Sequence, residues 1–167
     1  MMKATLKARP FDSEEEAIDA IIHKRIQPGD AVFIRYEGPK GSGMPEMFYT
    51  SEAISSDPKL AASIALITDG RFSGASKGPV IGHVSPEAQT GGPIALVEEN
   101  DLIHIDVEKR ILAIIGINGK EESPETIEKI LAERKNKWKP KPAKYKDGIL
   151  SIYTRLADSP MNGGRMI

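Results

Sequence analysis

Cysteine is absent from this 167-residue chain. Without cysteine the chain can form no disulfide, offers no thiolate nucleophile, and cannot hold zinc or an iron–sulfur cluster through sulfur ligands. The three histidines, His23, His83 and His104, are far apart in the sequence and show no metal-ligand spacing. Chemistry that depends on thiolates is therefore excluded from this chain taken alone.

An excess of one charge and a long apolar run are lacking too. Lys and Arg number 23 against 24 Asp and Glu, which gives a net charge of −1 and predicts no nucleic-acid-binding surface. No apolar run approaches the ~20 residues of a membrane span, and residues 1–10 lack the apolar core of a secretory leader. These absences predict a cytoplasmic protein with neither a membrane nor a nucleic acid as partner.

The length and the hydrophobic patterning predict one domain, residues 1–167, of the β-rich α/β class. Ser13 and Ser123 are placed to cap two helices, the first ending near Gln27, whereas residues 1–11 carry no clear signal. Apolar or alternating runs predict strands at residues 31–36, 64–67, 80–84, 94–97, 102–107 and 111–117. Strands in this density predict a barrel-like sheet flanked by helices.

The densest stretch for function follows the apolar run 64–67. Its loop contains Arg71, Ser73, Gly74 and Ser76, which are residue types that bind anions or let a ligand approach the backbone. Each glycine also costs backbone entropy on folding, so such a loop contributes little to a core. The residue types alone leave two readings open, a ligand-binding loop and a glycine-rich turn capped by serines.

A second irregular loop, residues 37–46, contains three glycines and two prolines and ends at Glu46. Loops at strand ends carry binding groups more often than the elements do. Glu46 has a plain reading as well, as a solvated glutamate that opens a helix over residues 47–54, where the helix dipole favours an acid. From residue types alone, the plain reading is the better supported.

The C-terminal third ends in a basic, proline-containing segment and a polar tail. Residues 135–144 are interpreted as a solvated linker rather than a nucleic-acid patch, with Trp138 anchoring it to the domain. Residues 139–167 are expected to form an extended tail, with a short helix or extended piece at 146–156. The last residues, 159–167, are expected to be mobile or to depend on a partner.

Several motifs in one order carry a more specific signal, at residues 36–40, 43–47, 68–74, 82–88 and 91–94. With them the chain resembles the C-terminal part of dihydroxy-acid dehydratase and its relatives, phosphogluconate dehydratase and the sugar-acid dehydratases. The resemblance extends from Phe11 to about Pro140. It implies a swivelling β/β/α domain that closes over a larger domain holding an iron–sulfur cluster through cysteines.

The resemblance also implies a reaction and roles for the matched residues. The reaction is dehydration of a 2,3-dihydroxy acid to a 2-keto acid, as in branched-chain amino-acid biosynthesis. The magnesium-binding glutamate of the family falls on Glu46 and its serine base falls on Ser73. Arg71, Gly74 and Ser76 fall where substrate-binding loop groups are expected.

The chain departs from the family pattern because it lacks the cluster domain and the remaining magnesium ligands. The isolated chain is therefore expected to be inactive until it meets a cysteine-bearing N-terminal domain or subunit, and a homodimer is expected only by resemblance. Two alternatives stay open: a sugar-acid dehydratase domain, and a non-catalytic swivelling domain kept for binding or regulation.

Overall fold

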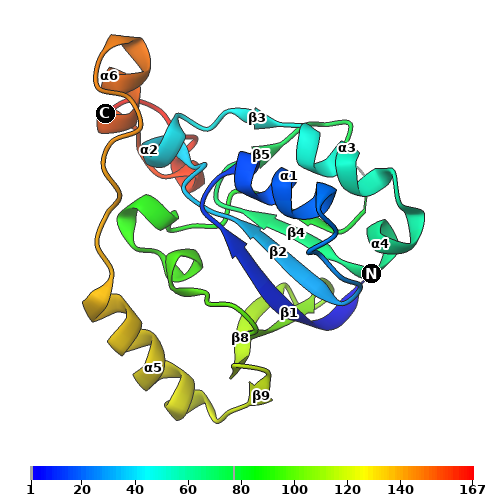
Figure 1. Cartoon of the computed structure of the whole chain (residues 1–167). Coiled ribbons are helices and arrows are strands. Elements are labelled where there is room, and N and C mark those ends of the chain that lie inside the picture. The colour runs from blue at the N-terminus through cyan, green and yellow to red at the C-terminus, as the bar shows by residue number, and fades with distance from the viewer. Residues whose placement is uncertain (1, 77) are drawn as a thin grey trace.

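The computed structural model describes residues 2–76 and 78–167 and has a mixed sheet at its centre (Figure 1). Seven strands form the sheet in the order β6-β4-β2-β1-β7-β8-β9. Their bounds are β1 Lys3–Phe11, β2 Asp30–Ile34, β4 Ala65–Thr68, β6 Val80–Ile81, β7 Leu102–Asp106, β8 Ile111–Ile117 and β9 Lys120–Glu121. A separate pair is formed by β3 (Glu46–Met47) and β5 (Arg71–Phe72).

The sheet has a parallel half and an antiparallel half. Strands β1, β2, β4 and β6 run parallel, and β7, β8 and β9 continue from β1 as an antiparallel meander. Within the described residues β6 and β9 are the two edges and do not pair with each other, so the sheet is open. The β-rich α/β class is confirmed, whereas the expected barrel-like sheet is wrong, because a barrel requires the two edge strands to pair and these do not.

Helices lie on both sides of the sheet and beyond one of its ends (Figure 1). Helices α1 (Glu14–Ile22), α3 (Tyr49–Ser55) and α4 (Pro58–Ser63) lie along the parallel strands. The short 3-10 helices η1 (Ala88–Thr90) and η2 (Pro93–Leu96) cover the opposite face, next to α5 (Pro124–Lys137). The remaining elements are α2 (Pro39–Ser42), α6 (Gly148–Leu156) and η3 (Pro160–Asn162).

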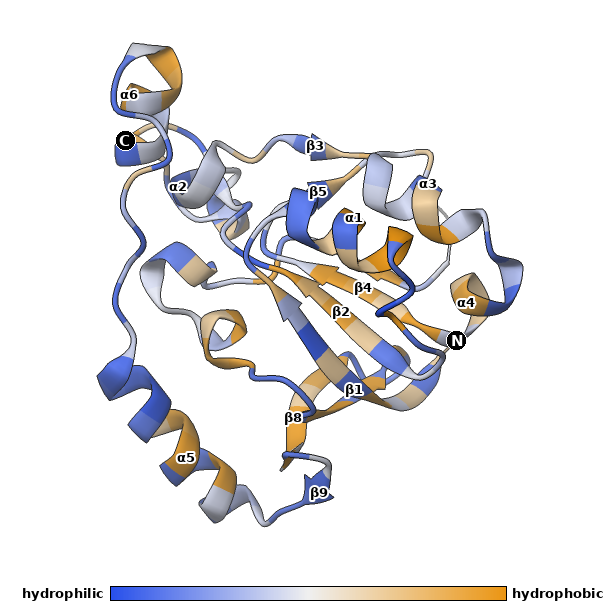
Figure 2. Cartoon of the chain, viewed as in Figure 1, coloured by the Kyte–Doolittle hydropathy of each residue, from blue (hydrophilic) through white to orange (hydrophobic). Residues whose placement is uncertain are grey.

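Successive residues of β2 build the two cores in turn. Ala31 and Phe33 point into the core under η2, whereas Val32 and Ile34 point into the core under α1. This follows from the two-residue period of a strand, and burial on both faces explains why the run is apolar throughout (Figure 2).

One strand was missed and one expected strand is a helix. Residues 3–11, which carried no clear signal, form the long β1 between β2 and β7. Leu6 and Ala8 alternate with exposed Lys7, but the run contains two alanines and Pro10, which are weak strand formers. The apolar run 94–97 was expected to be a strand, but most of it lies in η2, which begins at Pro93 and packs its apolar residues onto the sheet.

The predicted helix caps and the predicted anchor are confirmed. Ser13 Oγ accepts the Glu16 N–H and Ser123 Oγ accepts the Thr126 N–H, each at 3.2 Å. Trp138 donates its indole N–H to Tyr36 Oη at 3.2 Å. The segment 135–144 is exposed at every residue except Trp138, as expected of a solvated linker, although residues 135–137 belong to α5 and Lys141 pairs with Asp12 and covers the Tyr36 ring.

Helix α5 is fixed to the sheet by a buried ion pair. Arg134 donates two parallel hydrogen bonds to Asp101, at 2.5 and 3.1 Å, and a third to the Leu96 carbonyl. The side chain of Asp101 is 1% exposed, so its charge has little access to water. Removing Arg134 would leave this carboxylate without its main counter-charge.

We therefore expect Arg134→Ala to lower the free energy of unfolding by about 3–5 kcal/mol. Lys129→Ala, an exposed change on the same helix, is the control and is expected to change it by less than about 0.5 kcal/mol. Urea titration of both variants measures the difference. Equal stability of the two variants would contradict a bracing role for the ion pair.

Candidate functional site

Three loops that follow parallel strands meet at one end of the sheet. They are residues 35–45 after β2, residues 69–76 after β4, and residues 82–87 after β6. The register places the ends of β2 and β4 level, with Ile34 opposite Thr68. In open α/β sheets the carboxyl ends of the parallel strands are where ligands bind.

Glu46 and Arg71 lie opposite each other in the pair β3–β5, although 25 residues separate them in the sequence. Met47 opposes Phe72 in the same pair, and the Ser73 N–H donates to the Met47 carbonyl at 2.8 Å. Met47 is fully buried, so Glu46 on the other side of the strand is exposed. The loop after β2 and the loop after β4 therefore converge, through backbone hydrogen bonds.

The plain reading of Glu46, as the residue that opens a helix, is wrong. Glu46 lies in β3, and the helix expected over 47–54 begins only at Tyr49. The helix dipole therefore gives no account of an acid at this position. The pairing of β3 with β5 does place Glu46 beside the loop of residues 69–76.

A cavity of about 390 Å³ lies against the loop of residues 69–76. The four predicted residues Arg71, Ser73, Gly74 and Ser76 all line it, and Glu46 on the neighbouring strand does not. The other lining residues are Phe72, Val80, Gly82 and His83.

Hydrogen bonds fix the loop that carries these side chains. Arg71 Nε donates to the Met44 carbonyl at 2.9 Å and so links the two loops. Ser76 Oγ donates to Ser51 Oγ at 3.0 Å, which ties the loop to α3. Ser76 therefore has a structural partner in addition to any ligand. The terminal amino groups of Arg71, in contrast, make no hydrogen bond within the described residues.

Three buried carboxylates, which the sequence analysis did not single out, hold the loops in place. Asp69 is fully buried and accepts backbone N–H groups of Tyr36, Glu37 and Ala88, at 3.2, 3.0 and 2.7 Å. Glu87 accepts the N–H groups of Lys40 and Gly41, both at 3.0 Å.

The third carboxylate, Glu37, accepts from Ser42 Oγ and from the Glu14 N–H. Burial raises the pKa of Glu37, Asp69 and Glu87 above that of a solvated carboxyl. Glu37 and Asp69 each stand directly before a glycine in the sequence, whereas Glu87 lies between Pro86 and Ala88 and carries no such signal.

His83 was also not assigned a role from the sequence. The backbone N–H of His83 donates to the Gly70 carbonyl at 2.9 Å, and the φ of His83, 58°, is rare for a residue other than glycine. This conformation belongs to the turn that brings the chain after β6 to the cavity. His83 thereby adds a titratable ring to the lining of the cavity beside Ser73.

Glu46 fits one position of a magnesium site. It offers an exposed carboxylate, a hard oxygen ligand of the kind Mg²⁺ prefers. Across residues 2–76 and 78–167 no group of three or more His, Cys, Asp or Glu side chains is placed to hold a metal ion. A metal bound at Glu46 would therefore take its other ligands from substrate, water or another chain.

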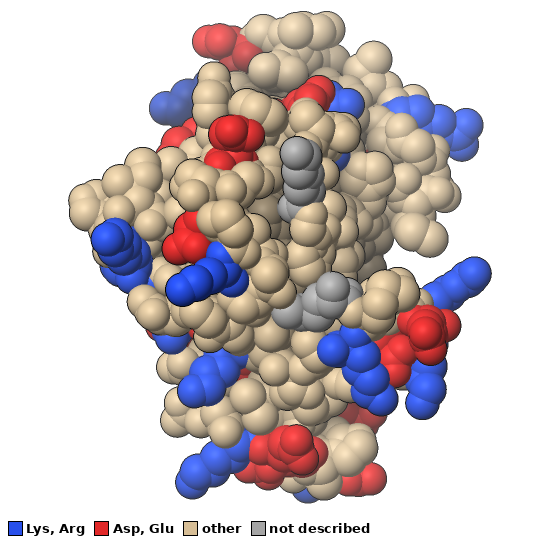
Figure 3. Space-filling view, turned by 90° about the vertical axis from the view of Figure 1, so that its right-hand side faces the viewer, with Lys and Arg blue, Asp and Glu red and all other residues tan. Residues whose placement is uncertain are grey.

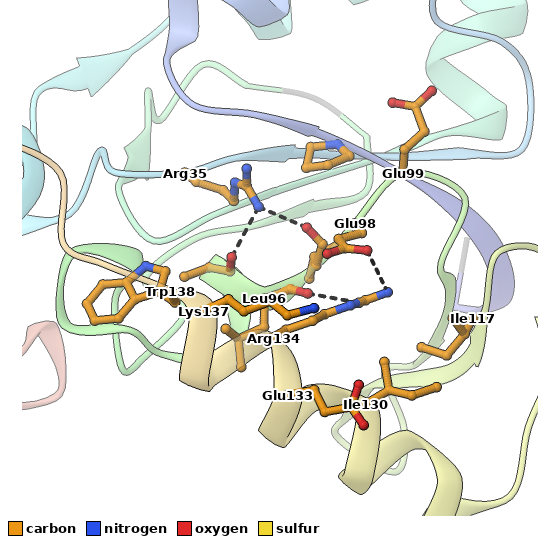
Figure 4. Close-up of a pocket in the computed structure, with 13 residues that line it drawn as sticks. Arg35, Leu96, Glu98, Glu99, Ile117, Ile130, Glu133, Arg134, Lys137 and Trp138 are labelled. Carbon is orange, nitrogen blue, oxygen red and sulfur yellow. Dashed lines mark hydrogen bonds and ion pairs between the residues drawn. The ribbon is translucent and has the colours of Figure 1, made fainter.

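A second hollow, of about 580 Å³, lies between α5 and residues 95–99 (Figure 4). Two arginines face it, but their N–H groups are engaged inside the protein. Arg35 donates to Asp12 and to the carbonyls of Ala95 and Val97, and Arg134 is paired as described above. We interpret this hollow as part of the brace for α5 and not as an anion site.

Neither charge nor apolar length marks another kind of site. On the face shown in Figure 3, basic and acidic side chains are interspersed and form no large field of one sign. Among the helices described, none has the length and apolarity that a membrane span requires.

The two loop glycines Gly74 and Gly70 differ in what they leave room for. A Cβ at Gly74 would meet no atom within 4 Å, whereas a Cβ at Gly70 would lie 2.5 Å from the Glu37 carbonyl oxygen. We expect Gly74→Ala to leave the free energy of unfolding unchanged or to raise it by up to about 1 kcal/mol. Gly70→Ala should lower it by about 1–3 kcal/mol. Urea titrations measure both, and a destabilised Gly74→Ala would show that Gly74 has a structural role.

The raised pKa of Glu37 gives stability a pH dependence of defined sign. The folded chain keeps the proton where the unfolded chain, with a pKa of about 4.3, has lost it, so the free energy of unfolding falls as pH rises. We expect Glu37→Gln, which keeps an acceptor for Ser42, to lose less stability than the original chain between pH 5 and pH 7. Urea titrations at both pH values measure this.

Glu15→Gln is the control, because hydrogen bonds lower the pKa of Glu15 and its contribution is lost only at acidic pH. Glu15→Gln should therefore lose as much free energy of unfolding between pH 5 and pH 7 as the original chain does. If Glu37→Gln behaved like the control, Glu37 would already be ionised in the folded chain at pH 5.

Comparison with known proteins agrees with the resemblance seen in the motifs. The family described as dihydroxy-acid/6-phosphogluconate dehydratase C-terminal matches residues 1–164. Dihydroxy-acid dehydratase of Clostridium novyi is 51% identical over 158 residues, which are 93% of this chain and 26% of that protein. That of Moorella thermoacetica is 50% identical over 164 residues, 98% of this chain and 28% of the relative.

A third relative gives the same picture. Dihydroxy-acid dehydratase of Ignicoccus hospitalis is 48% identical over 160 residues, 95% of this chain and 27% of the relative. The chain thus spans about a quarter of the length of the curated relatives it matches. The family match and relatives of about 50% identity together show that this chain belongs to the dihydroxy-acid/6-phosphogluconate dehydratase C-terminal family.

Proposed function

We propose that this chain supplies the C-terminal half of the active site of a dehydratase that converts a 2,3-dihydroxy acid to a 2-keto acid. The observation that carries the proposal is the convergence of Glu46, Arg71 and Ser73 on the paired segments β3 and β5. The similarity to dihydroxy-acid dehydratases supports the reaction class and favours a dihydroxy acid over a sugar acid.

Ser73 is the base in this proposal, and its Oγ takes the proton from C2 of the substrate. The hydroxyl on C3 leaves with its bonding electrons and takes up the proton that Ser73 removed, which forms water and returns Ser73 to its starting state, and the enol that remains tautomerises to the 2-keto acid. A free serine hydroxyl is a weak base, and a divalent cation bound nearby would lower its pKa and hold substrate oxygens.

Arg71 and Gly74 bind and orient the substrate in this proposal. The terminal amino groups of Arg71 suit two parallel hydrogen bonds to the substrate carboxylate, while its Nε stays on Met44. Gly74 leaves open space where a Cβ would be, so a ligand can approach the backbone there. Glu46 would contribute one carboxylate ligand to the Mg²⁺ ion.

The family resemblance implies an iron–sulfur cluster. Because this chain has no cysteine to hold one, the cluster is expected on the part of the relatives that this chain does not span. That region would then be the principal partner, and without it the chain is expected to be inactive. A homodimer, a cytoplasmic location and a single domain over residues 1–167 with a tail from residue 139 remain predictions.

The test uses a chimaera in which this chain replaces the matching C-terminal quarter of the Clostridium novyi enzyme. We expect the chimaera to form keto acid from a branched 2,3-dihydroxy acid, and the isolated chain to form none. Ser73→Ala should lower kcat of the chimaera at least ~100-fold, because proton transfer by a positioned base contributes about 10²–10⁴-fold.

Ser56→Ala is the matched control, since its hydroxyl donates to the Ala53 carbonyl at the end of α3, away from the cavity. It should leave kcat within about twofold. Unimpaired turnover by Ser73→Ala would remove Ser73 as the base. A folded chimaera that acts only on aldonates would favour the sugar-acid alternative, and one that acts on neither substrate would favour a non-catalytic domain.

A further inference from the structure

The C-terminal helix α6 has its polarity inverted relative to an ordinary surface helix. Its buried residues are Ser151 and Thr154, whereas Ile149 is 71%, Ile152 43% and Leu156 44% exposed. These three apolar residues recur at helical spacing and share one face. In Figure 2 the hydrophobic colour of α6 appears on a helix that projects beyond the body of the molecule.

The tail after α6 extends the same apolar surface. Met161, Met166 and Ile167 are 79%, 53% and 72% exposed. Met166 pairs with Ala157 in a β-bridge, and the Ile167 N–H donates to the Leu156 carbonyl at 3.0 Å. The tail therefore folds back along α6, and we call Ile149, Ile152, Leu156, Met161, Met166 and Ile167 together the α6 surface.

The α6 surface lies at the end of the molecule where the candidate site is. Helix α6 packs on α2, which lies between β2 and Glu46 in the sequence. In Figure 1, α6, α2 and the pair β3–β5 follow one another along the same edge. A protein that covered the α6 surface would therefore reach the side on which Glu46 and Ser73 lie.

From this inversion and this position, we infer that the α6 surface is the docking site for the part of the relatives that this chain does not span. This inference rests on the proposed function and identifies the surface through which the partner binds this chain. That part makes up about three quarters of each relative, and the family match places this chain at the C-terminal end. A region of that size, needed beside Glu46 and Ser73, accounts for a surface that exposes apolar residues while turning serine and threonine inward.

Amide hydrogen exchange in the chimaera described above tests the docking directly. Amides of residues 149–156 and 161–167 are expected to exchange at least tenfold more slowly in the chimaera than in the isolated chain. The double substitution Ile149→Glu and Ile152→Glu should restore fast exchange at these amides. Glutamate is a good helix former, so the helix itself is expected to persist. Ile22→Glu, a change at a 65% exposed apolar residue of α1, is the control and should leave the protection unchanged.

Equal exchange of these amides in the chimaera and in the isolated chain would overturn the inference. A second measurement needs only the isolated chain, whose mass in solution is expected to be that of a monomer. Dimerisation that is lost in the Ile149→Glu, Ile152→Glu variant would also overturn it, because a second copy would then be the occupant.

Exchange and mass are read without turnover, so the two proposals fail separately. Protection of α6 in a chimaera that forms no keto acid would leave the docking and remove the proposed reaction. Keto-acid formation with unprotected α6 amides would do the reverse.

Discussion

The carboxylate of Asp69 is the interaction on which the candidate site depends. It is fully buried and accepts three backbone N–H groups, from Tyr36, Glu37 and Ala88, which belong to two other loops. These bonds satisfy donors that would otherwise be buried without partners, and such donors are costly. Asp69 therefore fixes the loop after β2 and the start of η1 to the end of β4.

The pair β3–β5 converts this fixed arrangement into a site. Its backbone hydrogen bonds place Glu46 and Arg71 opposite each other, while Met47 on the other side anchors the pair in the core under α1. Functional side chains on short, anchored strands are held more narrowly than side chains on free loops. Among the described residues no group of three or more His, Cys, Asp or Glu side chains is placed to hold a metal ion, so the proposed reaction requires further ligands from outside this chain.

An incomplete site and an incompletely covered surface occur in the same chain and at the same edge. The sheet buries its apolar residues on both faces, and Arg134 fixes α5 to it, so the body of the domain is well packed. Helix α6, in contrast, buries Ser151 and Thr154 and leaves its isoleucines and leucines exposed. The partner proposed above, docked at the carboxyl end of the parallel strands, would account for both features.

Local patterns determined the elements that local physics controls. The capping serines Ser13 and Ser123 and the apolar strand β4 were readable because caps and burial on both faces leave a signature within a few residues. The motifs likewise determined the family. Strand β1 was missed because its alternating pattern rests on two alanines and Pro10, which are weak strand formers. The open sheet was missed because closure depends on which distant edges pair. Only the tertiary structure decided that Glu46 stands beside Arg71 and that Asp69 binds two other loops, since both contacts join residues that chain order leaves far apart.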